Sequence, residues 1–240
     1  MKQSIFILLI FFYSQVQAQI LKGLKDAVTG SGDGSVSFTQ QEAGKAIIEA
    51  LQKGAVKGVA EVSQKDGYLG NPKIKIPFPK EVQIVETKLR AIGMDKLVDD
   101  AVMSINRAAE DAAVEAKDIF VGSIKQLTFK DAIEIIKGEE NAATQYLQRT
   151  TTDSLAVRFR PIIANSLEKV NATKYWDDVM SRYNQIPFTK KVNEDLTGYA
   201  TEKAIEGLFV MIAKEELKIR EDPVARTSDI LKKVFGGSKD

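Results

Sequence analysis

The side chains able to do chemistry in this chain are carboxylates, amines and hydroxyls, because the sequence has no histidine and no cysteine. Their absence excludes Ser-His-Asp and Cys-His catalysis, zinc sites with the usual ligands, haem held by histidine, and iron sites that need Glu-x-x-His. Neither Gly-x-Gly-x-x-Gly nor a P-loop is present, so no nucleotide site is predicted. No cofactor and no metal site are expected.

Two adjacent glutamates, Glu215 and Glu216, are the most interesting carboxylates, since one of them falls on the apolar stripe of its predicted helix. A carboxylate that faces a core needs a basic partner or a raised pKa. The candidate partners are Arg107, Arg158 and Arg220. An internal ion pair is the favoured interpretation, and a catalytic acid of the glycosidase kind is the alternative.

A compact polar group lies beside another apolar stripe and consists of Asn106, Arg107 and Glu110. Arg107 and Glu110 are three residues apart, which suits a pair on one helix face. A solvated surface pair is the simpler interpretation, and a patch facing a cleft between helices is the alternative. Ser166 and Lys169 match a Ser-x-x-Lys pattern, but the companion Lys-Thr-Gly is missing, which favours coincidence.

Aromatic residues at helical spacing usually fill a core, and the alternative is that they line a pocket between helices. The aromatic set is Tyr175, Trp176, Tyr183, Tyr199 and Phe209. The polar and aromatic candidates together predict a binding cleft without catalytic residues. Its predicted members are Asn106, Arg107, Glu110, Tyr146, Arg158, Tyr199, Glu215 and Glu216.

The elements that must position these residues are helices, because apolar residues recur every three or four positions over most of the chain. The pattern predicts an all-α, single-domain bundle of about eight or nine helices. Met94–Leu127, with an alanine-rich middle, is predicted to be the longest uninterrupted helix and the central one. Glu194–Arg220 is the second long helix. A helix from the cap at Thr39 to about Lys65 contains three glycines, which suggest close packing on a neighbour.

Three further features interrupt or connect the helices. Gln148–Ser154 contains residues that prefer helix caps, so a break is predicted there, with Pro161 in the first turns of the helix that follows. Gly67–Pro79 has three prolines and alternating Lys and Ile, and is predicted to be an extended strap or single edge strand across the bundle. Shorter helices are predicted at Gln19–Val28, Glu81–Ile92, Thr128–Lys137, Glu139–Gln148, Thr173–Tyr183 and from Ser228 to Gly236.

The N-terminal residues 1–18 are typical of a secretory signal peptide, with Lys2, a short apolar run and a small-x-small cleavage site ending at Ala18. Residues 19–38 then form a short helix and a Gly/Ser linker, and residues 39–237 form the helical domain. We therefore expect an exported, periplasmic protein. No other stretch has the ~18 apolar residues of a membrane span. Removing Lys2 leaves equal numbers of basic and acidic residues, which argues against nucleic acid as a partner.

Several stretches together resemble the DUF4197 family of exported bacterial proteins. They are SINRAAEDAA at 104–113, GEENAATQY at 138–146, GYLGNPKIKIPFP at 67–79, and the region 195–237 with EELKIRE and DILKKVFGG. The resemblance implies an exported helical protein of unknown function. It carries over no catalytic residues.

Three functions compete on these grounds. The leading hypothesis is a non-enzymatic cell-envelope module that binds a partner protein or a small apolar molecule; a small-molecule site would be a cavity lined by aromatic residues and edged by arginine. The second is a carboxylate-dependent enzyme acting on envelope polymers, with two carboxylates ~5–10 Å apart in an open groove. The third is a pure interaction scaffold with an exposed apolar patch.

Overall fold

The computed structural model describes residues 40–173, 176–177, 195–221 and 229, and in these ranges the chain is all-α. The described part contains seven α-helices, one short 3-10 helix and no strand. The elements are α2 (Gln40–Val62), η1 (Lys80–Val82), α3 (Gln83–Ala91), α4 (Asp95–Ala113), α5 (Ala116–Lys125), α6 (Phe129–Lys137), α7 (Ala142–Lys169) and α9 (Leu196–Glu221).

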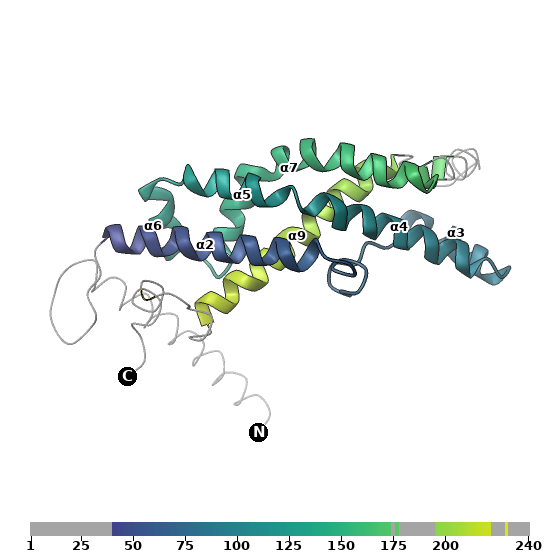
Figure 1. Ribbon diagram of the computed structural model, residues 1–240. Coiled ribbons are helices and arrows are strands. Elements are labelled where there is room, and N and C mark those ends of the chain that lie inside the picture. The colour runs from purple at the N-terminus through teal and green to yellow at the C-terminus, as the bar shows by residue number, and fades with distance from the viewer. Residues whose placement is uncertain (1–39, 174–175, 178–194, 222–228, 230–240) are drawn as a thin grey trace, which may run out of the picture.

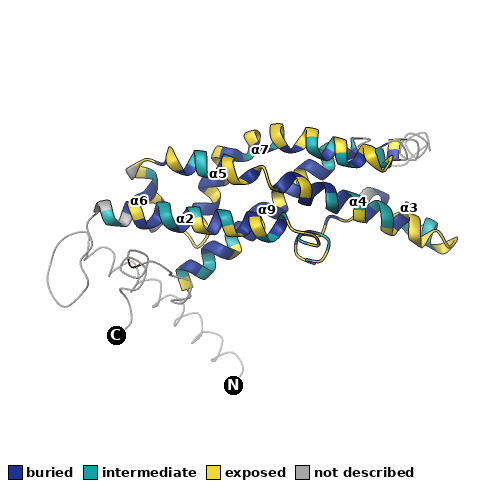
Figure 2. Cartoon of the chain, in the orientation of Figure 1, coloured by how far each residue is buried: buried dark blue, intermediate teal, exposed yellow. Residues whose placement is uncertain are grey.

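The helices form a bundle in which α2, the α4–α5 pair and α7 run lengthwise and α9 crosses them obliquely (Figure 1). The helix α9 packs against α2, α4 and α7, and α5 joins α2 to α7. The helix α3 packs chiefly on α4 and η1, so the α3–α4 hairpin projects from one end of the bundle. Dark blue buried residues line the faces where the long helices meet (Figure 2).

The predicted central helix, Met94–Leu127, is wrong as one element. It is divided into α4 and α5 at Val114 and Glu115, where the Glu115 backbone nitrogen bonds to the oxygen of Ala112, three residues back. Helix propensity favours continuity through these alanines, so the interruption reflects packing rather than local preference. The alanines of this stretch are fully buried: Ala108, Ala109, Ala112, Ala113 and Ala116.

The predicted break at Gln148–Ser154 is also wrong, because α7 runs through it and is the longest described helix. The hydroxyls of Thr150 and Thr152 donate hydrogen bonds to carbonyls four residues back, at 2.9 and 2.6 Å, so these residues are compatible with a helix interior. Pro161 therefore lies inside α7 and not in a first turn. The carbonyl that loses its helical partner belongs to Val157, an exposed residue.

Other local predictions are confirmed. The predicted close packing at the glycines of α2 is found at Gly54 and Gly58, which face α9 closely enough that a Cβ on Gly58 would lie 3.2 Å from Cγ1 of Ile212. The predicted helix Thr128–Lys137 appears as α6, and Thr128 and Asp131 form a capping box at its start. The second predicted long helix appears as α9, within two residues at its start and one at its end.

Residues 71–79, between α2 and η1, contain no helix or strand. Their side chains alternate, with Ile74, Ile76 and Phe78 buried and Lys73 and Lys75 exposed. Turns occupy residues 65–70 and 72–74, with Asp66 at a φ of 67°. The prediction of an extended strand from Gly67 is therefore wrong as far as residue 74.

The predicted signal peptide, short N-terminal helix, Gly/Ser linker and final helix lie outside the described residues, as does most of Thr173–Tyr183. None of the helices in the described residues combines the length and the apolar character that crossing a membrane requires.

Candidate functional site

The polar group on α4 (Asn106, Arg107 and Glu110) holds the segment 66–79 against the bundle. The side-chain amide of Asn106 accepts a hydrogen bond from the nitrogen of Ile76 and donates one to its oxygen, both at 2.8 Å. This reproduces the pairing that a neighbouring strand would give. One oxygen of Glu110 accepts from the backbone nitrogens of Tyr68 and Leu69 at 3.1 and 3.2 Å. These contacts make α4 the anchor of a segment that has no secondary structure of its own.

Arg107 completes this group by bridging two carboxylates. Its guanidinium pairs with Glu110 on the same helix and with Asp66, 2.7 Å away across the segment. Hydrogen bonds to these partners, Glu110 first, raise the pKa of Arg107. The side chain of Glu110 is 4% exposed, so the pair is not the solvated one that the spacing suggested. Removing Arg107 would leave a buried carboxylate short of one partner.

Two tyrosine hydroxyls, one from the segment and one from α9, join the segment to α9. The hydroxyl of Tyr68 donates to the oxygen of Ala204 at 2.6 Å, and that of Tyr199 donates to the oxygen of Pro77 at 2.9 Å. Tyr68 is completely buried, and burial first, then the charge of Glu110, raises the pKa of its phenol. The segment is thus fixed between α4 and α9 at both of its ends.

Glu216 on α9 caps a different helix. Its carboxylate accepts hydrogen bonds from the backbone nitrogens of Ala143 and Thr144 at 3.0 and 2.8 Å, and from the Thr144 hydroxyl at 2.7 Å. Asn141, the N-cap residue of α7, makes no side-chain cap hydrogen bond. A carboxylate at a helix N-terminus is also favoured by the helix dipole. Arg220 neutralises Glu216 at 2.8 Å and donates to the oxygen of Ile135, which ties α6 to the same point.

Glu215 points to other partners than its neighbour does. It is buried and pairs with Lys57 of α2 at 2.8 Å and with Lys218 of its own helix. Burial alone would raise the pKa of Glu215, but hydrogen bonds from Lys218 and Lys57 hold it below its ordinary value. The two glutamates therefore serve as separate structural ion pairs, and the predicted partner Arg158 pairs with neither of them.

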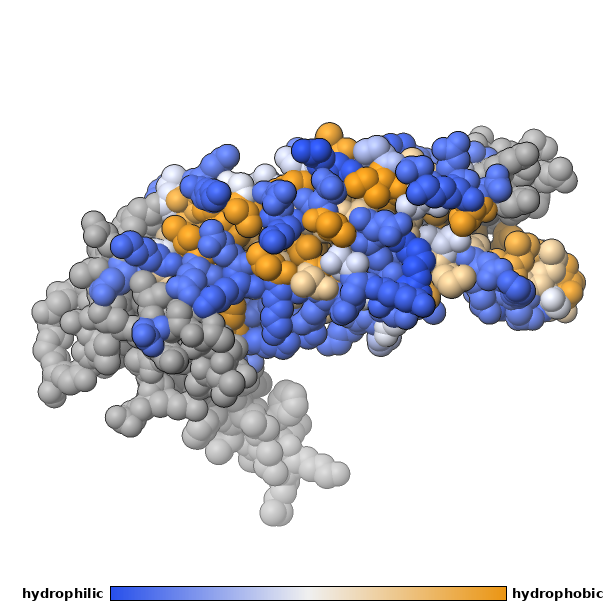
Figure 3. All heavy atoms as spheres, in the orientation of Figure 1, coloured by the Kyte–Doolittle hydropathy of each residue, from blue (hydrophilic) through white to orange (hydrophobic). Residues whose placement is uncertain are grey.

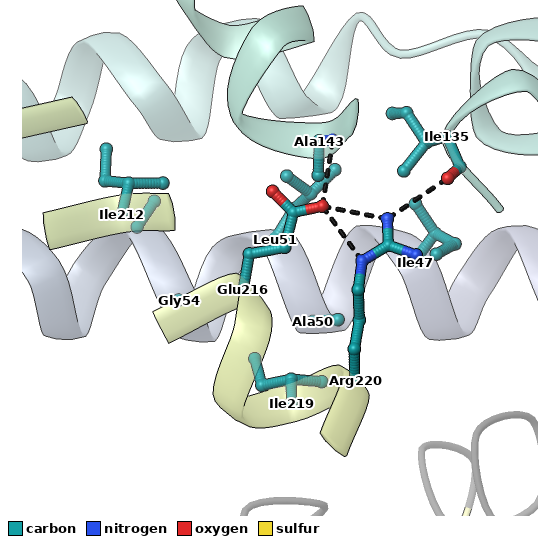
Figure 4. Close-up of a pocket in the computed structure, with 11 residues that line it drawn as sticks. Ile47, Ala50, Leu51, Gly54, Ile135, Ala143, Ile212, Glu216, Ile219 and Arg220 are labelled. Atoms are coloured by element: carbon teal, nitrogen blue, oxygen red, sulfur yellow. Dashed lines mark hydrogen bonds and ion pairs between the residues drawn. The ribbon is translucent and has the colours of Figure 1, made fainter. Parts of the chain in front are cut away.

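A small cavity of about 30 Å³ lies between α2 and α9, next to the Glu216–Arg220 pair (Figure 4). Figure 4 shows the carboxylate of Glu216 turned toward Ala143 and Arg220 reaching toward Ile135. The remaining lining is aliphatic: Ile47, Ala50, Leu51, Gly54, Ala55, Ile212 and Ile219. Room of this size suits a water molecule or two and not an organic ligand.

The aromatic candidates pack in other places. Trp176 contacts Phe78 with ring centroids 5.6 Å apart, and Phe209 contacts Phe120 at 5.9 Å. Tyr175 and Tyr183 lie outside the described residues. The cavity beside Glu216 has no aromatic residue in its lining.

The eight predicted site residues therefore do not share one cleft. Four of them hold the segment 66–79: Asn106, Arg107, Glu110 and Tyr199. Glu215 and Glu216 join α9 to its neighbours. Two lie apart on α7: buried Tyr146, 5.7 Å below the guanidinium of Arg149, and exposed Arg158. No group of three or more acidic side chains in the described ranges is arranged to hold a metal ion.

A surface that the sequence reasoning missed lies on the projecting hairpin. We call it the apolar arm and define it by Ile84, Ile92, Met94 and Leu97 of α3, the turn and the start of α4. These side chains are 54%, 72%, 40% and 47% exposed. No residue of α3 is buried, and apolar atoms gather at this end of the molecule in Figure 3.

Charged contacts hold the arm in one shape. Arg90 of α3 pairs with Glu86 at 3.1 Å and crosses to Asp95 and Asp99 of α4 at 3.4 and 2.8 Å. Gly93 makes the turn with a φ of 79°, a conformation that glycine adopts without strain. Val85 and Leu89 of α3 pack against the core, whereas Ile84 in the same helix and Ile92 just after it are exposed.

The chain matches the family model described as "Protein of unknown function (DUF4197)" over residues 37–236. No curated protein and no solved structure matches the chain.

Proposed function

The chain belongs to the DUF4197 family, and from this premise and the geometry above we propose that it is a non-enzymatic, exported cell-envelope protein that binds a protein partner through its apolar arm. The observation that carries the proposal is the cluster of four large, exposed apolar side chains between residues 84 and 97. Single exposed apolar residues are ordinary, whereas a contiguous apolar patch marks an interaction site.

The size of the cavity favours a protein partner over a small molecule. A cofactor or drug-sized ligand needs a pocket of roughly 300–1,000 Å³. The cavity beside Glu216 is about 30 Å³, so binding at the surface agrees better with the described residues.

The hydrogen bonds and ion pairs of the buried carboxylates favour a binding protein over an enzyme. Glu110, Glu215 and Glu216 each accept hydrogen bonds or ion pairs from cations, and Glu110 and Glu216 also accept from backbone amides. A glycosidase needs one protonated and one ionised carboxyl facing a substrate groove. Carboxylates that neighbouring cations and amides neutralise are suited to holding helices together.

The proposed location rests on the N-terminal sequence, where residues 1–18 have the charge, apolar run and cleavage site of a signal peptide. We expect the protein isolated from cells to begin at Gln19, and to be released from the periplasm. Intact mass measurement and fractionation of the same cells test both statements.

We further propose that Gly67–Pro79, which begins with turns and ends in an irregular stretch, serves as a strap that sets the direction of the arm. The proposed domain as a whole has eight or nine helices. The strap leads directly into η1 and α3. Its support comes from the contacts of Asn106 and Glu110 on one side and of Tyr199 on the other. A rigid base reduces the conformational entropy that binding at the arm would cost.

Site-specific photo-crosslinking in the cells that make the protein tests the proposed function. A photo-reactive side chain is placed at position 92 in the arm or at position 157 on α7, because Ile92 and Val157 are equally exposed at 72% and 73%. We expect a discrete protein adduct from position 92 and none from position 157. No adduct from position 92, or the same adducts from both positions, would refute the proposal.

A further inference from the structure

A chemically reactive dipeptide, Asp66–Gly67, lies in the turns that follow α2 (Figure 1). Asp-Gly sequences rearrange to isoaspartate more readily than other Asp-containing dipeptides, because glycine has no side chain to shield its nitrogen from the neighbouring carboxyl group. The sequence contains a second such pair at Asp33–Gly34. Of the two pairs, only Asp66–Gly67 lies in the described residues, and its contacts decide whether it can react.

The turn itself requires these residue types. Asp66 has a φ of 67°, which lies in the left-handed region that Asp adopts more readily than most side chains do. A Cβ on Gly67 would lie 2.7 Å from the backbone oxygen of Glu61 and closer still to that of Val62, so glycine alone fits there. The turn therefore keeps glycine after Asp66, and with it the reactive dipeptide.

Two contacts engage the atoms that would have to react with each other. The carboxylate of Asp66 pairs with Arg107 at 2.7 Å, and the nitrogen of Gly67 donates a hydrogen bond to the oxygen of Gln64 at 2.9 Å. Ring closure requires the carboxyl group to turn toward that nitrogen, so both contacts must break first. The side chain of Asp66 is 53% exposed, so the ion pair restrains it rather than burial, and water reaches the site.

We propose that Asp66–Gly67 is an isoaspartate-forming site that the ion pair with Arg107 restrains in the folded protein. The Gly67 nitrogen bonds to Cγ of Asp66 and loses its proton, and a carboxyl oxygen leaves as water. Water then adds to the backbone carbonyl carbon in the resulting succinimide ring and breaks its bond to the Gly67 nitrogen, which leaves isoaspartate. One water is lost and one is regained, so no other reactant is needed. The inference goes beyond the proposed function and does not depend on it.

Formation of isoaspartate would release the segment 66–79 from α4. The main chain would then run through Cβ and Cγ of residue 66, which lengthens it by one carbon atom. The next two backbone nitrogens, of Tyr68 and Leu69, donate to Glu110 at 3.1 and 3.2 Å and would be displaced from it. A slow chemical change in the turn would thus loosen the anchorage of this segment.

Incubation of the purified protein at neutral pH, either folded or in urea, tests the proposal. Mass spectrometry with electron-transfer fragmentation distinguishes isoaspartate from aspartate at position 66. We expect isoaspartate to form about tenfold more slowly in the folded protein, because two hydrogen-bonded contacts must break. Arg107→Gln should speed the reaction in the folded protein about fivefold, as expected for loss of a partly exposed ion pair. Arg107→Lys keeps the charge and should retain the slow rate.

Two further variants serve as controls. Asp66→Glu should give no signal, because its longer side chain does not close this ring readily. Glu216→Gln removes a different ion pair and leaves Arg107 with Asp66, so it should not change the rate at position 66. Equal rates in folded protein and in urea, an unchanged rate in Arg107→Gln, or the same acceleration in Glu216→Gln would overturn the inference.

Limited proteolysis provides a second readout. Protein that has formed isoaspartate at position 66 should be cleaved faster within residues 66–79 than protein that has not, because that segment has lost its bonds to Glu110. Asp66→Glu incubated in the same way should show no such increase. Equal cleavage of the two forms would overturn the expected release of the segment.

Discussion

Glu216 of α9 lies 2.8 Å from the backbone nitrogen of Thr144 and supplies the N-terminal cap that α7 lacks in its own sequence. The same carboxylate holds Arg220, whose guanidinium reaches the oxygen of Ile135 at the end of α6. The Glu216–Arg220 pair therefore connects α9 to both α7 and α6.

Replacing Glu216 by glutamine should destabilise the fold by about 3 kcal/mol, because Arg220 loses its anionic partner in a buried site. Chemical denaturation followed by circular dichroism measures the change in unfolding free energy. Glu206→Gln is the control, since it removes an exposed pair with Lys203 and should cost less than about 1 kcal/mol. Equal effects of the two substitutions would contradict the capping role of Glu216.

Asn106→Ala should cost about 2–3 kcal/mol, because it leaves the buried nitrogen and oxygen of Ile76 without their partner. The substitution should also speed proteolytic cleavage within residues 66–79, which are held by this side chain. Asn165→Ala on the exposed face of α7 is the control and should change neither quantity. An unaltered cleavage rate in Asn106→Ala would argue against the strap.

Two glycine substitutions should change the unfolding free energy in opposite directions. A Cβ on Gly207 would lie 2.8 Å from Cε1 of Tyr68, whose ring is fixed by its hydrogen bond to Ala204, so Gly207→Ala should destabilise by about 1–3 kcal/mol. Gly122 in α5 has nothing within 4 Å of such an atom. Gly122→Ala should therefore stabilise by about 0.5–1 kcal/mol through helix propensity. Thermal denaturation of both variants decides whether the contact between α9 and Tyr68 is as close as described.

Stability should fall on acidification because of Glu215. Its pKa in the folded protein is lower than its ordinary value of 4.5, so the ion pairs with Lys218 and Lys57 contribute fully above that pH. The contribution is lost as the pH falls through the folded-state pKa. Glu215→Gln should make the unfolding free energy less dependent on pH below 4.5. Asp131 and Asp195, whose pKa values are also lowered, keep part of the slope. A slope identical to that of the unsubstituted protein would show that Glu215 is not paired in solution.

The same cluster should also lose stability at high pH, because of Lys57. The hydrogen bond to Glu215 raises the pKa of Lys57 above its ordinary value of 10.5. Its contribution is present below pH 10.5 and is lost as the pH rises through the folded-state pKa. Because Lys57 is largely exposed, we expect a small effect, which Lys57→Met should remove.

Features encoded by neighbouring residues could be predicted from the sequence. The close packing of the α2 glycines, the helix that follows Thr128 and the extent of α9 all follow from local sequence patterns. The threonines of α7 were misjudged because the same hydroxyls can either end a helix or bond back within one. The division between α4 and α5 depends on how other helices pack around the alanines.

The candidate site was harder to predict because its partners are distant in sequence. Glu110 bonds to Leu69, 41 residues earlier, and Glu216 bonds to Thr144, 72 residues earlier. The spacing of Arg107 and Glu110 predicts that they pair, but the burial of the pair depends on the segment that covers it. The apolar arm was missed because Ile84 and Ile92 resemble core residues until the structure places them on a projection.

The central claim, that the apolar arm binds protein, is tested most directly by native mass spectrometry of the protein isolated gently from its cell envelope. We predict a complex heavier than one chain by a whole protein subunit, and loss of that subunit in Ile92→Lys but not in Val157→Lys. A single chain carrying a small molecule, unaffected by Ile92→Lys, would contradict the account.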